Sequence, residues 1–146
     1  MNRQTFMLIG SLVAFAVAGL ALVWPSGLLA SKGVELGAPV SVWVREVGAL
    51  ILAFGVTTFH ARKSNDSVAL RAVLVGGAVL HLGLLPIELV AYWQGVITKA
   101  SGVAPNSVLH VTLGLASLHF ACSVTQDVRS EEGRRGNDGQ TGSDEL

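Results

Sequence analysis

The stretch VALRAVLVGGAVLHLGLLPIELVAYW, residues 68–93, decides the fold. It is long enough to cross a bilayer as a helix, which takes about 20 apolar residues. Inside this otherwise apolar run stand His81 and Glu88, which are seven positions apart. In a helix they leave the same face about two turns from each other. The role of the two residues therefore depends on whether that face meets water, lipid or other helices.

Three further apolar segments, residues 5–24, 42–60 and 107–125, have similar lengths. Only 14% of the whole chain is charged and 51% is hydrophobic, whereas a soluble domain carries about 25% charged residues. In hydrocarbon every backbone polar group must be paired within its segment, which favours helices. The sequence therefore predicts an all-α fold, a bundle of four transmembrane helices spanning residues 1–125.

The basic residues predict the orientation of this bundle. If the chain crosses the membrane four times, Lys32 and Lys99 fall on one side and Arg45 at a helix end. The other side holds Arg3, Arg62, Lys63, Arg71, Arg129, Arg134 and Arg135. Basic residues concentrate on the cytoplasmic side, so we expect a multi-pass protein of the inner (plasma) membrane with both termini in the cytoplasm.

Two segments outside the predicted spans have a recognisable composition. Residues 126–146, QDVRSEEGRRGNDGQTGSDEL, contain almost no apolar residues, so we expect a disordered cytoplasmic tail. Residues 25–41 form an outer connection that is a candidate for lying along the membrane surface. A signal peptide is the alternative for residues 5–24, but the run is long, and Leu28 suits poorly the minus-three position of a cut after Ala30.

Polar residues of three predicted helices fall at one depth. Arg45 and Glu46 lie in the outer turn of the second helix, Glu88 in the outer half of the third, and His110 one turn into the fourth. A charge at this depth costs at least a few kcal/mol, so such groups face the bundle interior and pair. We predict that Arg45 pairs with Glu88, leaving Glu46 near His110 or solvent. The alternative is that Arg45 and Glu46 extend to lipid headgroups.

Two further histidines lie deeper. His81 or His119, near the middle of the third and fourth helices, could ligate a haem or relay protons. A neutral histidine bonded to a neighbouring helix is the more ordinary arrangement, so we expect no haem or other cofactor and no metal site. His110 and His119 are nine positions apart and face opposite sides, so only one of them can share a site with His81.

Pro86 and the small residues predict how the bundle packs. Pro86 removes one helical hydrogen bond near His81 and Glu88, which favours a kink and a polar pocket toward the outer leaflet. Small residues at helical spacing allow helices to approach closely, either within the bundle or in a homo-oligomer. These are Gly48 and Gly55, then Gly10, Ala14 and Ala18, and finally Gly114, Ser117 and Ala121.

The first half of the chain resembles a known family. VREVGALILAFGV at 44–56, LVWPSGLLA at 22–30 and the basic turn HARK at 60–63 look like the small bacterial four-helix membrane proteins of the DoxX-like kind. Arg45, Gly48 and Gly55 match typical positions. The resemblance implies a bacterial inner-membrane protein, from a group that has been linked to quinone-coupled redox chemistry, but it supplies no catalytic motif.

Several function classes are excluded or left without support. The formal net charge of zero gives no indication of a nucleic-acid partner. The chain has no phosphate-binding glycine-rich loop, HExxH, nucleophile elbow or CxxC. We expect an accessory subunit or a binder of a lipophilic small molecule in the bilayer. The alternatives are transport by an oligomer, or a membrane-embedded isomerase or quinone-linked redox enzyme that uses Glu88 with His81 or His110 for acid-base chemistry.

Overall fold

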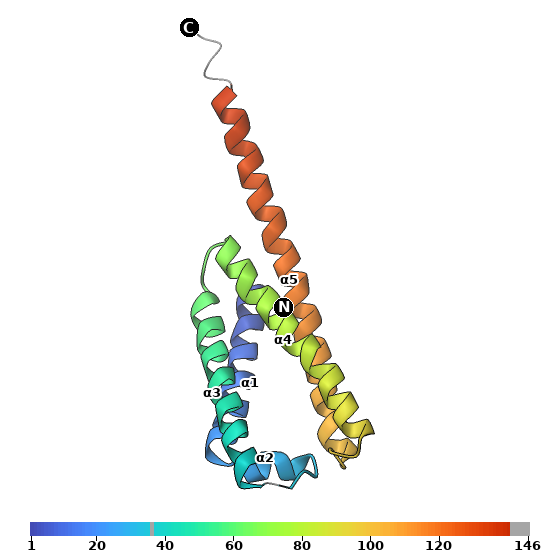
Figure 1. Cartoon of the computed structure of the whole chain (residues 1–146). Coiled ribbons are helices and arrows are strands. Elements are labelled where there is room, and N and C mark those ends of the chain that lie inside the picture. The colour runs from blue at the N-terminus through green and yellow to red at the C-terminus, as the bar shows by residue number, and fades with distance from the viewer. Residues whose placement is uncertain (36, 141–146) are drawn as a thin grey trace.

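The computed structural model describes residues 1–35 and 37–140, with side chains described as far as Val124. All regular elements of this part are helices (Figure 1). They are α1 (Arg3–Val23), α2 (Pro25–Ser31), α3 (Ala38–Ala61), α4 (Val68–Trp93) and α5 (Ala100–Gln140). Four of them, counting Ala100–Val124 of α5, are long and apolar enough to cross a membrane. The predicted all-helical, multi-pass architecture is therefore confirmed at this level, with the short α2 added.

Two helices begin at side-chain caps that the sequence supplies. The Asn2 side chain accepts a hydrogen bond of 2.8 Å from the backbone N–H of Thr5. The Ser67 hydroxyl accepts one of 3.2 Å from the N–H of Leu70. Asn and Ser are favoured at this position because they satisfy N–H groups that have no partner within the helix. The beginnings of α1 and α4 are thus fixed locally.

The fourth predicted span differs most from the structure. α5 begins at Ala100, seven residues before the predicted start at 107. Pro105 lies in its second turn, where it removes one hydrogen bond without ending the helix. The structure also differs from the predicted tail of 126–146, because the α5 backbone is helical through Gln140. A helix extended from an existing end avoids the cost of nucleation. Residues 141–146 of the predicted tail lie outside the described residues.

The long helices pack as two antiparallel pairs, α1 with α3 and α4 with α5, which meet each other at few positions (Figure 1). Glycines bring the first pair together. A Cβ atom at Gly48 would lie 2.9 Å from Ala21 Cβ, and one at Gly55 would lie 3.0 Å from Ala14 Cβ. Both distances are too short for ordinary contacts. The small residues of α3 therefore serve the close approach of α1 and α3 within one chain.

The second pair has an equivalent arrangement. A Cβ atom at Gly77 of α4 would lie 3.2 Å from the Ser117 hydroxyl oxygen of α5. A Cβ atom at Gly114 of α5 would lie 2.7 Å from the side chain of Leu82. The small residues predicted from the sequence thus line the α4–α5 contact, which sets the register that later brings polar side chains of the two helices together.

The two ends of the bundle are closed differently. At one end Arg3 forms an ion pair with Asp66 of the α3–α4 turn, above a core of Phe6, Met7, Leu70, Leu74, Leu113, Ala121 and Val124. At the other end α2 lies across the bundle (Figure 1). There the N–H groups of Thr98 and Lys99 each donate to the Lys32 carbonyl at 3.2 Å. The segment after α2 is thereby joined to the α4–α5 turn.

Candidate functional site

A cavity of about 410 Å³ lies between the two helix pairs. Each long helix contributes a residue to its wall every three or four positions, which is the spacing of one helix face. The contributing stretches are 6–21 of α1, 43–58 of α3, 73–88 of α4 and 106–117 of α5, with part of α2. The cavity therefore follows the bundle axis and is lined mainly by apolar side chains.

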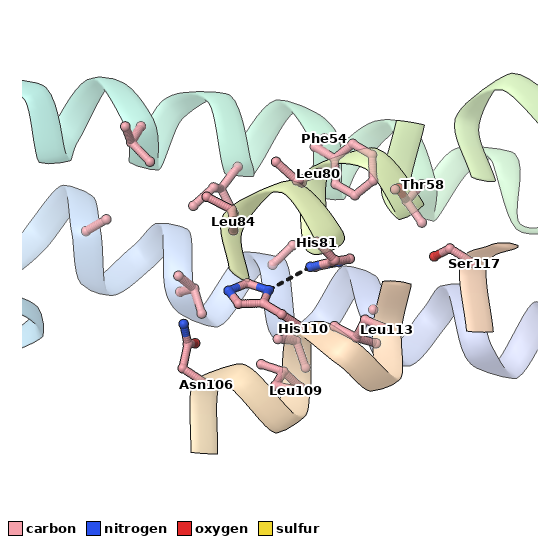
Figure 2. Close-up of a pocket in the computed structure, with 18 of the residues that line it drawn as sticks. Phe54, Thr58, Leu80, His81, Leu84, Asn106, Leu109, His110, Leu113 and Ser117 are labelled. Atoms are coloured by element: carbon pink, nitrogen blue, oxygen red, sulfur yellow. Dashed lines mark hydrogen bonds between the residues drawn. The ribbon is translucent and has the colours of Figure 1, made fainter. Parts of the chain in front are cut away.

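The polar residues of the wall are unevenly distributed. Asn106 and Ser117 lie toward opposite sides of the view in Figure 2, with His81 and His110 between them. Lys32 and Glu88 also belong to the wall. Most of the polar groups are therefore gathered from the middle of the cavity to the end that α2 covers.

Glu88 is the buried charged residue of this group, with 9% of its surface exposed. It forms an ion pair with Lys32, which follows α2. The side-chain amide nitrogen of Asn106 lies 2.7 Å from both carboxylate oxygens and donates to them. The prediction that Arg45 pairs with Glu88 is therefore wrong. α2 lies across the end of the bundle and brings Lys32 to the Glu88 carboxylate. The spacing of residues along a helix does not indicate this contact.

Arg45 and Glu46 lie outside the cavity wall, and both are exposed. The Arg45 Nε atom donates to the Leu22 carbonyl at 3.2 Å. This carbonyl belongs to the last turn of α1, where carbonyls have no partner within the helix. The predicted convergence of four groups is thus wrong for Arg45 and Glu46, and the side chain that contacts His110 is His81 rather than Glu46.

His81 and His110 form the second polar contact. Their Nδ1 atoms lie 3.0 Å apart, so one ring donates and the other accepts (Figure 2). The ring centroids are 5.2 Å apart. His119 is exposed, and its ring contacts Phe120 at 5.3 Å. The prediction that only one of His110 and His119 shares a site with His81 is confirmed, and His110 is that residue.

Sequence reasoning missed Lys32 and Asn106 as site residues. Asn106 had a usable signal, because it stands four positions before His110 and so shares its helix face. The predicted start of the helix at residue 107 leaves Asn106 outside the helix. Lys32 is 56 positions from Glu88, and the chain turns at Gly33, whose φ is 71°. No periodic pattern connects residues across such a turn.

The arrangement limits the chemistry of each group. Both oxygens of Glu88 already accept hydrogen bonds, so this carboxylate holds α2, α4 and α5 together. His81 and His110 use one ring nitrogen each and keep their Nε2 atoms for other partners. An apolar cavity with a few polar groups at one end is typical of a small-molecule binding site.

Comparisons of the chain with protein-family models, with curated proteins and with solved structures found no match. The resemblance of residues 22–63 to DoxX-like proteins therefore stays a prediction.

Proposed function

We propose that this chain is a bacterial inner-membrane protein that binds a lipophilic small molecule between its two helix pairs, as a binding protein or accessory subunit. The cavity of about 410 Å³ supports this, since small-molecule sites occupy roughly 300–1,000 Å³ and combine apolar walls with a few polar groups. The polar groups collected at one end give such a molecule a fixed orientation.

The outer surface supports a membrane location. Large apolar side chains are exposed on the outer faces of the spans, among them Leu50 at 70%, Val79 at 68% and Val108 at 67%. A continuous apolar surface of this kind suits lipid rather than water. The bilayer is therefore the main partner of these faces. A homo-oligomer is the alternative, and it would use faces other than the small-residue stripes that already pack within the chain.

The ends of the bundle support an orientation with both termini in the cytoplasm. Arg3 lies at the same end as the basic α3–α4 turn, since it pairs with Asp66 of that turn. The aromatic residues of the opposite end are all exposed, as expected for an interfacial belt. They are Trp24, Trp43, Tyr92 and Trp93. In this orientation Lys32 and Glu88 lie toward the outer leaflet.

An acid-base enzyme is the second candidate, and the contact between His81 and His110 favours it. Glu88 is less suited to that role, because both of its oxygens already accept hydrogen bonds from Lys32 or Asn106, and only part of its acceptor capacity is left for a substrate. Binding is therefore the simpler reading of the geometry, with an isomerase or quinone-linked redox activity resting on the histidines.

A cavity-filling variant tests the binding function. Gly10 lines the cavity, and a Cβ atom there would meet nothing within 4 Å. Gly19 is equally open but is exposed and absent from the cavity wall. We expect native mass spectrometry of protein purified in mild detergent to show a bound small molecule with wild type and with Gly19→Leu, and to show none with Gly10→Leu. Equal occupancy in all three proteins, or none in any, would overturn the proposal.

A further inference from the structure

The cavity is long enough for an extended hydrocarbon chain. Along α1 the wall runs from Phe6 to Ala21, which is about 22 Å at the helical rise of 1.5 Å per residue. This length suits an extended hydrocarbon chain.

The cavity also reaches the outer surface of the bundle. Trp43 and Val47 of α3 belong to its wall, yet they are 68% and 51% exposed. In a spanning helix these exposed surfaces face lipid. A hydrocarbon chain can therefore pass from the bilayer into the cavity along α3, and the membrane is the source of the ligand.

The polar end carries no net charge available to a ligand. Lys32 and Glu88 compensate each other in their ion pair, and Asn106 is uncharged. An anionic headgroup would compete with Glu88 for Lys32, and a cationic one would compete with Lys32 for Glu88. Either competition leaves one buried charge without its partner, which is costly in a low-dielectric site. The headgroup is therefore uncharged.

The remaining hydrogen-bonding atoms include both donors and acceptors. Asn106 donates its amide N–H groups to Glu88, which leaves its carbonyl oxygen as an acceptor. When His81 and His110 are both uncharged, sharing one proton between their Nδ1 atoms places a proton on the Nε2 atom of one ring and a lone pair on that of the other. With the N–H groups of Lys32 that Glu88 does not accept, the wall thus offers donors beside acceptors. A hydroxyl group donates and accepts at once and matches this set.

We propose that the ligand is a long-chain lipid alcohol, with its hydroxyl group at Asn106 and the His81–His110 pair and a chain directed toward Phe6 and Met7. This inference rests on the proposed binding function and adds the chemical class and the orientation of the ligand. A fatty acid or an alkylamine of the same chain length fits the same length of cavity and differs only at the headgroup.

Competition among three matched probes tests the headgroup. The full chain in lipid nanodiscs is labelled with a photoreactive hexadecanol that carries a diazirine at its chain end. Unlabelled hexadecanol, hexadecanoate or hexadecylamine is added as the competitor. We expect hexadecanol to compete about tenfold better than the two charged probes, the ratio that one or two hydrogen bonds supply. The double variant His81→Phe/His110→Phe should weaken competition by hexadecanol about tenfold, because the hydroxyl group loses its hydrogen bonds to the two rings, and should still take up the labelled chain. His119→Phe, on the exposed face of α5, should leave competition by hexadecanol unchanged.

The outcomes separate this inference from the binding function. Equal competition by all three probes, or competition by hexadecanol that the double variant leaves unchanged, would overturn the alcohol and leave the binding function standing. Labelling that Gly10→Leu does not reduce would overturn both.

The site of labelling in the wild-type protein provides a test that does not depend on whether a variant folds. The chain-end diazirine should modify residues around Phe6 and Met7, and modification near Lys32 instead contradicts the proposed orientation.

Discussion

Lys32, which follows α2, forms an ion pair with Glu88 of α4 at the end of the cavity. The pair connects the end of α2, which packs with α1 and α3, to α4 of the second helix pair, and it lies beside the hydrogen bonds that Thr98 and Lys99 donate to the Lys32 carbonyl. Asn106 of α5 donates to the same carboxylate. One buried acidic residue therefore joins α2 to both helices of the second pair.

Removing either partner of this ion pair should destabilise the protein. Lys32→Met leaves the Glu88 carboxylate buried with only Asn106 as a partner, and Glu88→Met leaves the ammonium group without its counter-ion. Since Lys32 keeps 21% of its side-chain surface exposed, we expect a loss of about 2 kcal/mol, between the values for exposed and fully buried pairs. Thermal unfolding of the purified protein in detergent measures the loss.

Two further variants provide the control for this pair. The double variant Lys32→Met/Glu88→Met should recover most of the loss, because it leaves no unpaired charge. Arg45→Met, which the sequence alone would have paired with Glu88, should change the unfolding temperature little, since Arg45 is exposed. A large effect of Arg45→Met together with none of Lys32→Met contradicts the observed pairing.

The contact between His81 and His110 should contribute measurably to the association of α4 and α5. We expect a double-mutant cycle with His81→Phe and His110→Phe to give a coupling of about 0.6 kcal/mol, the average for hydrogen bonds between membrane helices. The same cycle with His119→Phe in place of His110→Phe should give none, because His119 is exposed. Coupling of the same size in both cycles would indicate a general effect of the ring substitution.

Gly48 should not tolerate a larger residue. In Gly48→Val the new Cβ atom would lie 2.9 Å from Ala21 Cβ and 3.4 Å from the backbone nitrogen of Leu22. Since Ala21 has no rotamer to move to, α1 and α3 must separate, at about 1–3 kcal/mol. Gly83→Val is the control, as nothing lies within 4 Å of its Cβ position. Equal unfolding temperatures for the two variants would show that α1 and α3 do not approach closely at Gly48.

The ion pair between Arg3 and Asp66 should matter much less than the one at the opposite end. Its side chains keep 23% and 28% of their surface exposed, and pairs near water contribute about 0–1 kcal/mol. We therefore expect Asp66→Asn to have a small effect on thermal unfolding. Added salt should reduce that effect further, because it screens charges that reach solvent. A loss as large as that of Lys32→Met contradicts this ranking.

The sequence predicted the elements of the fold well because each span is a local property. About 20 apolar residues between polar turns specify a membrane helix whatever the rest of the chain does. The predicted bounds of the third span, residues 68–93, are the bounds of α4. The glycine stripes were equally readable, since close helix packing needs small residues at helical spacing.

The partners of the polar residues were harder to predict, because they depend on how the helices are arranged. Spacing gave the shared face of His81 and Glu88 and excluded His119 from the site of His81. It could not choose between Arg45 and Lys32 as the partner of Glu88, since that choice depends on the path of α2 across the bundle end. The depth of Arg45 along its helix also predicted the wrong partner, because its side chain donates a hydrogen bond to the Leu22 carbonyl of α1.

Cysteine labelling tests the orientation of the bundle. Cys122 is exposed, so the background is Cys122→Ser. Ser64→Cys lies in the turn beside Arg62 and Lys63, and Gln94→Cys follows the aromatic end of α4. Since basic residues stay on the cytoplasmic side, an impermeant maleimide should label Gln94→Cys in intact cells and label Ser64→Cys only after permeabilisation. The reverse pattern would place Lys32, Glu88 and the polar end of the cavity toward the cytoplasmic leaflet and contradict the proposed topology.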